Sequence, residues 1–267
     1  EVVGVERIFN RSHKTRGLKY TEYFGDGDCK AFSAVKDVYG ENSVKKYECI
    51  GHVQKRVGNR LRNLKKSKKG LGGKGKLTDK FIDKLQNYYG IAIRSNVGNL
   101  QRMQSAVIAA FFHCCSSKNK LMHGQCPSGA NSWCKYKKSL HDGLPFVETS
   151  SGLQSSIINI VKPAYMNLCD KELLSKCLHG RTQNANESFN GLLWNILPKS
   201  TFVELQTLEL GGKIAVLLFN SGFLGLKPVF ENLGIKLNEE TVKRYMHFDK
   251  ERIEHSKRFS LPAVKMA

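Results

Sequence analysis

The sequence predicts an α/β fold with a large all-helical insertion, and two observations carry this prediction. In the first 66 residues, segments whose apolar residues recur at helical spacing alternate with short, aromatic-rich segments bounded by glycine. This alternation is typical of a sheet covered by helices. Beyond residue 76 the recurring pattern is helical. We therefore expect a small sheet at the front of the chain and a helical middle.

The front of the chain predicts three helices and two strands in alternation. Apolar residues spaced by three or four predict the helices, and glycines bound the first strand. In chain order the elements are a helix over 1–14, a strand over 18–24, a helix over 31–38, a strand over 43–50 and a helix over 52–66.

The rest of the chain predicts further helices separated by a loop-rich stretch over 116–151. Thr78 is placed to cap the first of these helices. Pro163 is expected to end one later helix and Pro198 another, because proline lacks the backbone donor that a helix needs. Residues 78–115 are expected to be largely helical. The later expected helices are 153–162, 171–177, 184–197, 202–219 and 239–257, and Gly211 and Gly212 weaken the helix over 202–219.

These elements group into five segments along the chain. The segment SKKGLGGKGK combines glycine with lysine and is expected to be a linker. The expected segments are a partial sheet domain over 1–66, the basic linker over 67–76, a helical insertion with a Cys/His cluster over 77–178, a glutamate-bearing helix and its successor over 179–234, and a basic C-terminal tail over 235–267.

Net charge is the first indication of function. The chain has 43 Lys and Arg against 23 Asp and Glu, which gives +20 at neutral pH. Such an excess favours nucleic acid, because phosphate contacts release counterions. No acidic residue lies between Glu48 and Asp79, so this stretch is the expected nucleic-acid surface. Its candidate contacts are Lys55, Arg56, Arg60, Arg62, Lys65, Lys66, Lys68 and Lys69.

Two bulk features argue against other classes of protein. Eight cysteines without a secretory signal indicate a reduced, intracellular chain rather than a disulfide framework. No apolar run reaches the roughly 20 residues that span a bilayer, so no membrane partner is expected.

An acidic turn follows the first expected strand. Asp26 and Asp28 stand in the sequence GDGD directly after it. Carboxylates at a strand's end project into the cleft at the sheet edge, where α/β folds bind ligands. Gly-Asp-Gly-Asp is also good turn chemistry, and the motif alone favours that simpler interpretation.

Two later motifs also carry polar residues suited to chemistry. Cys49 and His52 form a Cys-x-x-His pair after the second strand, which is half of a zinc site. In the helix over 184–197, Glu187 lies off the apolar face, with Asn184 and Asn190 as neighbours. A lone carboxylate among amides leaves room for a ligand, and a solvated polar face explains the pattern equally well.

In this order, GDGDCKAF, ECIGHVQKR and TQNANESFN resemble the Mutator-like transposases, from the first helix to about Gly234. The resemblance implies an RNase H-like catalytic fold. In that fold the second catalytic Asp ends a strand, a Cys-x-x-His follows on the next strand, and an all-α insertion precedes the catalytic Glu. The corresponding residues here are Asp26, with Asp28 as the alternative, then Cys49, His52 and Glu187.

The resemblance implies a DDE-type transposase that cleaves and transfers DNA strands in the nucleus. Two divalent ions, Mg²⁺ or Mn²⁺, held by three carboxylates would activate the attacking oxygen and stabilise the leaving one. The implied partners are transposon ends and target DNA. Copies of such a transposase commonly assemble as a homo-oligomer on DNA.

The sequence departs from this family pattern at the first catalytic carboxylate. No Asp precedes Asp26, and Glu1, Glu6 and Glu22 lie on a helix or on the same strand as the acidic turn. We therefore expect an N-terminally incomplete transposase that lacks the first three strands and does not cut DNA alone. The alternative is a catalytically inactive, transposase-derived DNA-binding protein.

A Cys/His-rich stretch predicts a structural zinc site. Two imidazoles and two thiolates suffice for a closed tetrahedral site, and a metal would order a loop with little apolar content. Cys114 or Cys115 could replace the first histidine. Similar transposases carry a resembling H…HxxCP…SWC segment. A zinc-stabilised interaction module without a nucleic-acid role is a third hypothesis. The expected ligands are His113, His123, Cys126 and Cys134.

Two tryptophans could stack on an exposed base. Packing is the simpler expectation for both. We expect Trp133 to pack against the Cys/His loop and Trp194 to lie in a core or an interface.

Overall fold

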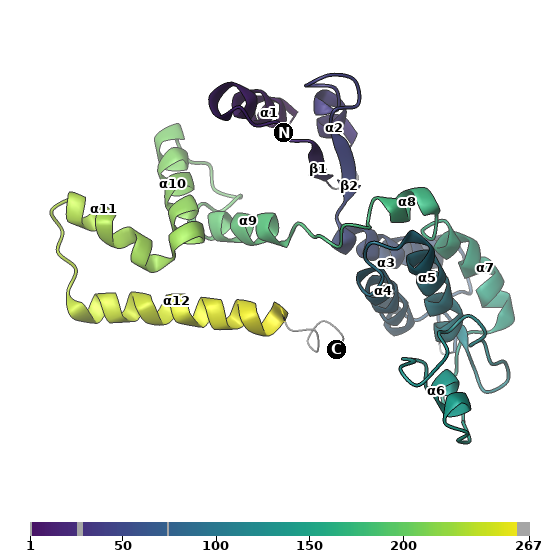
Figure 1. Cartoon of the computed structure of the whole chain (residues 1–267). Helices are drawn as coiled ribbons and strands as arrows, with labels where there is room; N and C mark the ends of the chain where they lie inside the picture. The colour runs from purple at the N-terminus through teal and green to yellow at the C-terminus, as the bar shows by residue number, and fades with distance from the viewer. Residues whose placement is uncertain (1, 26–28, 74, 261–267) are drawn as a thin grey trace. The chain divides into compact units, whose positions relative to one another are not determined.

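The computed structural model describes residues 2–25, 29–73 and 75–260. The chain divides into two compact units, one ending at Gln183 and the other beginning at Asn184. Figure 1 shows the whole chain, and each unit is described by itself below.

The front of the first unit contains a small sheet flanked by helices. Its elements are α1 (Val2–Arg16), β1 (Glu22–Gly25), α2 (Cys29–Val35) and β2 (Lys45–Glu48). The two strands are parallel, and Gly25 pairs with Glu48. The α/β beginning is therefore confirmed. Each strand has four residues, fewer than expected. A turn in which Asn42 N donates to the Asp37 carboxylate precedes β2, and α3 begins two residues after β2 ends.

A helical bundle follows β2 without a break (Figure 1). Its main core lies where α3 contacts α4 and α7 and where α4 contacts α5. Two fully buried tyrosines form hydrogen bonds between segments that are distant in the sequence. Tyr89 donates to Leu168 O at 2.6 Å, and Tyr165 donates to Val107 O at 2.8 Å. The helices are α3 (Ile50–Ser67), α4 (Asp79–Arg94), α5 (Leu100–Cys115), α6 (Lys135–His141), α7 (Ser155–Met166) and α8 (Lys171–Ser175).

One expected helix end is wrong. Pro163 lies inside α7, which continues to Met166. A proline inside a helix removes a hydrogen bond and costs about 3 kcal/mol. Burial on the turn after Pro163 offsets this cost, since the Tyr165 side chain is fully buried. Here tertiary packing outweighs the tendency of proline to end a helix.

The second unit is entirely helical in its described residues. Gly211 and Gly212 lie inside one continuous helix rather than interrupting it. A Cβ on Gly211 would lie 2.6 Å from Leu197 Cδ1, so glycine permits this close approach. The elements are α9 (Asn184–Ile196), α10 (Leu205–Ser221), the 3₁₀ turn η1 (Phe223–Leu226), α11 (Lys227–Asn232) and α12 (Glu239–Ser260). Across the described parts of both units, no helix combines the length and apolarity that a membrane span requires.

Candidate functional site

The carboxyl ends of β1 and β2 form one edge of the sheet. Because the strands are parallel and Gly25 pairs with Glu48, the chain leaves both strands at this edge. Cys49 is buried there and lies at the N-cap position of α3. His52 lies in the first turn of the same helix and is half-buried. Asp26 and Asp28, the acidic-turn candidates, lie outside the described residues.

A returning segment, residues 176–183, is hydrogen-bonded to this strand edge. Glu48 N donates to Lys176 O at 3.0 Å, and His179 Nε2 donates to Glu48 O at 3.0 Å. Gln183 Nε2 donates to Phe24 O at 2.7 Å, and Gln183 N donates to Cys49 Sγ at 3.3 Å. The returning segment thus joins the ends of both strands.

His179 and Gln183 were not predicted to position this edge. The His179 ring lies edge-on to Phe24 at 4.9 Å and to Tyr47 at 5.3 Å. Gln183 stands in the TQNANESFN motif immediately before α9. The motif drew attention to Glu187, but nothing in the sequence shows that Gln183 contacts a strand 159 residues earlier.

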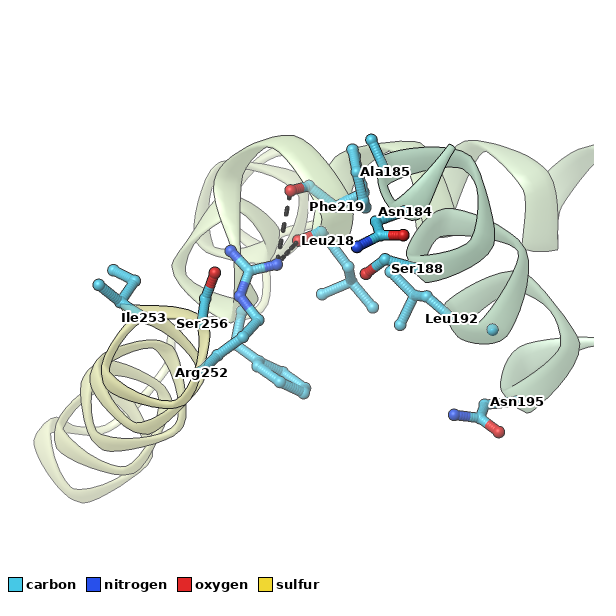
Figure 2. Close-up of a pocket in the computed structure, with 12 residues that line it drawn as sticks. Asn184, Ala185, Ser188, Leu192, Asn195, Leu218, Phe219, Arg252, Ile253 and Ser256 are labelled. Carbon is cyan, nitrogen blue, oxygen red and sulfur yellow. Dashed lines mark hydrogen bonds between the residues drawn. The ribbon is translucent and has the colours of Figure 1, made fainter. Parts of the chain in front are cut away.

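Glu187 lies in the first turn of α9, in the second unit, and is exposed. A pocket of about 760 Å³ runs beside α9 (Figure 2). Asn184, Ser188 and Asn195 face it from α9, and the Arg252 guanidinium donates to Leu218 O at 2.8 Å across it. Glu187 is not among the residues that line this pocket, although Asn184 and Gly191, one turn away on the same helix, are.

Four side chains of the first unit form a compact His/Cys cluster. His113 ends α5, and the other three come from the loop between α5 and α6. The ligand atoms of the four side chains all lie within 4.8 Å of one another. The members of this cluster are His113, His123, Cys126 and Cys134.

Three separations inside the His/Cys cluster match a tetrahedral site, and Cys126 Sγ lies slightly farther from His123 Nδ1, at 4.0 Å. With metal–nitrogen and metal–sulfur bonds of about 2.1 and 2.3 Å, a tetrahedron places two nitrogens about 3.4 Å apart and nitrogen and sulfur about 3.6 Å apart. The two histidine Nδ1 atoms are 3.2 Å apart. Cys126 Sγ lies 3.6 Å from His113 Nδ1, and Cys134 Sγ lies 3.6 Å from His123 Nδ1. The donor set therefore fits a zinc ion.

Two neighbours orient His123 toward the centre of the cluster. Its Nε2 lies 2.9 Å from Glu148 Oε2 and 3.0 Å from Ser116 Oγ. When Nε2 carries the proton and donates to Glu148, Nδ1 is left as the bare nitrogen that a metal requires. Burial raises the pKa of Glu148, but hydrogen bonds from Ser150 N, His123 and Ser116 outweigh it, and the net shift is downward.

Burial also sets the protonation of the cluster in the absence of a cation. Burial, reinforced by His123 and Lys84, lowers the pKa of His113 to about 4. Burial and the neighbouring Cys134 raise the pKa of Cys126 to about 12. His113 is therefore neutral near pH 7, ready to coordinate, whereas Cys126 must release a proton when a cation binds.

The eight basic candidates on α3 and the linker divide into two groups. Arg56 pairs with Glu48 at 2.5 Å, Lys65 pairs with Asp79 at 3.0 Å, and Arg62 pairs with Asp83. These three cations are held in ion pairs with carboxylates of the same unit. The other five are exposed, namely Lys55, Arg60, Lys66, Lys68 and Lys69.

Comparison with known proteins identifies the lineage. The family model of the Mutator-like transposases matches residues 1–134, half of the chain. The chain belongs to the Mutator-like transposase family. No curated protein and no solved structure matches it. Membership implies DNA as a partner and divalent metal ions as cofactors, and the matched residues contain the strand pair and every member of the His/Cys cluster.

Proposed function

We propose that this Mutator-like chain belongs to a DDE-type transposase that, in the complete protein, cleaves DNA strands and transfers them in the nucleus. The proposed catalytic fold is RNase H-like, the bundle from α4 to α8 is its insertion, and the active assembly is a homo-oligomer on transposon ends. The observation that carries the proposal is the family match, because it spans both strands, the acidic turn and Cys49–His52.

Two carboxylates of the chain have the chemistry for the proposed catalysis. Asp26, with Asp28 as the alternative, and Glu187 would hold Mg²⁺ or Mn²⁺, because such cations prefer hard oxygen ligands. When bound, the ions activate the attacking oxygen and stabilise the leaving one. Glu187 is exposed on α9, so its carboxylate is accessible to solvent and to large ligands.

A nicking assay on the complete protein, with radiolabelled duplex DNA and Mn²⁺, tests the assignment. We expect Glu187→Gln and Asp26→Asn each to lower the rate by roughly 100-fold or more, since metal coordination contributes several kcal/mol to transition-state stabilisation. Glu209→Gln is the matched control, because Glu209 is an exposed glutamate of the same unit. Loss of activity in Asp28→Asn but not in Asp26→Asn would reassign the aspartate.

A catalytically inactive DNA-binding protein is the second candidate function. The observation that favours it is the net charge of +20, which supports DNA binding whether or not the protein cleaves DNA. DNA binding without nicking under any divalent ion would establish this function instead.

The exposed cations of α3 provide the proposed duplex surface. Lys55 and Lys66 are exposed on one helix, and neither is held in the ion pairs that fix Arg56, Arg62 and Lys65. We expect Lys55→Glu and Lys66→Glu to weaken duplex binding and to reduce its salt slope by about one unit each. Lys171→Glu, at an exposed position on α8, controls for net charge. An unchanged salt slope in both α3 variants would contradict the assignment.

We further propose that the His/Cys cluster binds one structural zinc ion. The tetrahedral separations and the Glu148 contact to His123 support this assignment. Bound zinc would hold the loop of residues 116–134 against the end of α5. Metal analysis of protein purified without chelator should give about one equivalent of zinc.

A further inference from the structure

A polar groove of about 870 Å³ lies between the start of α5 and the loop of the His/Cys cluster. We propose that this groove binds an unpaired base of single-stranded DNA, with Trp133 as the stacking platform. The proposal rests on the DNA function proposed above and adds a second, structurally distinct DNA site to it. The groove belongs wholly to the first unit.

Trp133 is held in place and yet exposed. Its ring lies edge-on to His113 at 4.7 Å and to Tyr88 at 6.0 Å, which fixes the indole against the His/Cys cluster. Even so, 47% of the residue remains accessible. Because this half-exposed indole is already ordered, stacking on a base costs less conformational entropy than it would for a mobile side chain.

The other groove residues suit the edge of a base. Carboxamides offer a donor and an acceptor side by side, the combination that pairs with adenine through two hydrogen bonds. Five carboxamides line the groove, and none of its lining residues is acidic. The carboxamides are Asn96, Asn99, Gln101, Gln125 and Asn131.

Arg102 supplies the groove with a cation, which a phosphate linked to the bound base requires. The chain's net charge of +20 favours an anionic partner over a neutral one of similar polarity. The exposed indole, the amide chemistry and the charge therefore point to a nucleotide rather than to a sugar or a neutral peptide.

The α5 side of the groove is organised before any ligand binds. Asn99 Oδ1 accepts from Arg102 N at 2.9 Å, and Asn96 Nδ2 donates to Ala92 O at 2.8 Å. These bonds fix both amides and leave Asn99 Nδ2 and Asn96 Oδ1 for a ligand. Gln125 and Asn131 lie on the cluster loop, so zinc binding would organise the opposite side.

The groove is connected to the strand edge through the returning segment. Gly98 N, between Asn96 and Asn99, donates to Leu178 O at 3.0 Å. The next residue, His179, donates to Glu48 O at the end of β2. A base held in the groove would therefore lie on the same unit as the strand from which the acidic turn extends.

Fluorescence and binding measurements on the full chain test the proposal. In a Trp194→Phe background, Trp133 is the single tryptophan reporter. A 12-nucleotide single strand of mixed sequence should quench its emission, and a blunt hairpin duplex should not. Stacking contributes about 1–3 kcal/mol per base, so Trp133→Ala should weaken single-strand binding roughly 5- to 150-fold. Trp133→Phe should restore part of the affinity.

A second variant tests the proposal independently of whether Trp133→Ala folds. Gln101 is exposed in the first turn of α5, where a negative charge does not harm a helix. Gln101→Glu should weaken single-strand binding by repelling phosphate while zinc content and thermal stability stay unchanged. Single-strand affinity within twofold of the parent in both variants would overturn the proposal.

Two further outcomes separate this site from the duplex surface. If heparin, a polyanion without bases, quenches Trp133 as strongly as DNA does, the groove is only an electrostatic patch and the proposal fails. If duplex binding and nicking are absent while the single strand still quenches Trp133, the proposed transposase function fails and the base site stands.

Discussion

The two units of this member of the Mutator-like transposase family are both rich in helix, but they hold their helices in different ways. The bundle of the first unit buries large side chains completely, among them Leu85, Tyr89 and Phe111. In the second unit, the described residues of α9 and α11 bury no side chain, and α10 buries Gly211, Ala215 and Leu218.

Local interactions take a larger share of stabilisation in the second unit. Lys213 pairs with Glu209, and Lys227 with Glu231, each one turn apart on a helix. Such pairs contribute about 0.3–0.5 kcal/mol each, far less than a buried Leu side chain. The comparison teaches that similar helix content can conceal very different stability, and that the first unit is the scaffold on which the proposed DNA sites are built.

Loss of the metal should have the largest effect. We expect Cys134→Ser to lose zinc and to lower the melting temperature of the first unit by roughly 10 °C, because a ligand at about 1,000 times its Kd contributes about 4 kcal/mol and each kcal/mol shifts a unit of this size by about 2–4 °C. Calorimetry with parallel metal analysis measures both quantities. Cys169→Ser, at a buried cysteine outside the His/Cys cluster, should retain zinc. Full zinc content in Cys134→Ser would contradict the cluster assignment.

Core truncation tests the comparison between the units directly. Leu85 is fully buried between helices of the bundle, so Leu85→Ala should destabilise the first unit by about 2–5 kcal/mol through a cavity. Leu208 on α10 is 47% exposed, and Leu208→Ala should change stability by less than about 0.5 kcal/mol. Hydrogen exchange resolved by peptide measures each unit separately. Equal effects would show that the second unit has a core of its own.

Features with a local cause were predictable from the sequence. Thr78 Oγ1 accepts from Phe81 N at 3.2 Å, the capping bond that the sequence predicts at the start of α4. The end of α9 at Ile196 also has a local cause, because Pro198 two residues later lacks the backbone donor that a helix needs. The four expected zinc ligands come together because three of them lie on one short loop, where chain connectivity limits their separation.

Features that depend on distant contacts were not predictable. Glu148 reaches His123 across 25 residues, and Gln183 reaches Phe24 across 159. The same limit applies to the basic stretch, where charge alone does not reveal that Arg56 pairs with Glu48. The candidate site was therefore predicted as a set of residue types, whereas the contacts that position those residues emerge only from the fold.

The ion pair at the strand edge allows stabilising cations to be distinguished from the proposed DNA-binding ones. Glu48 is buried and its side chain is 10% exposed, so Arg56→Gln should leave its carboxylate without this cation and cost about 1–3 kcal/mol, between the values for surface and buried pairs. Lys55→Gln, at the neighbouring exposed position, should leave stability unchanged and weaken duplex binding. Urea denaturation and DNA titration of both variants measure the two effects. A stable Arg56→Gln variant with weakened DNA binding would return Arg56 to the DNA surface.

The smallest effects are expected where α10 meets Leu197 in the second unit, and two adjacent glycines provide a matched pair. A Cβ at Gly211 would meet Leu197 at 2.6 Å, so Gly211→Ala should cost about 1–2 kcal/mol by overpacking. A Cβ at Gly212 would meet nothing within 4 Å, so Gly212→Ala should stabilise α10 by up to about 1 kcal/mol through helix propensity. Hydrogen exchange of α10 peptides measures the stability change, and therefore its sign, in each variant. If both variants stabilise α10 equally, the contact with Leu197 carries no weight, and the second unit is held by its individual helices alone.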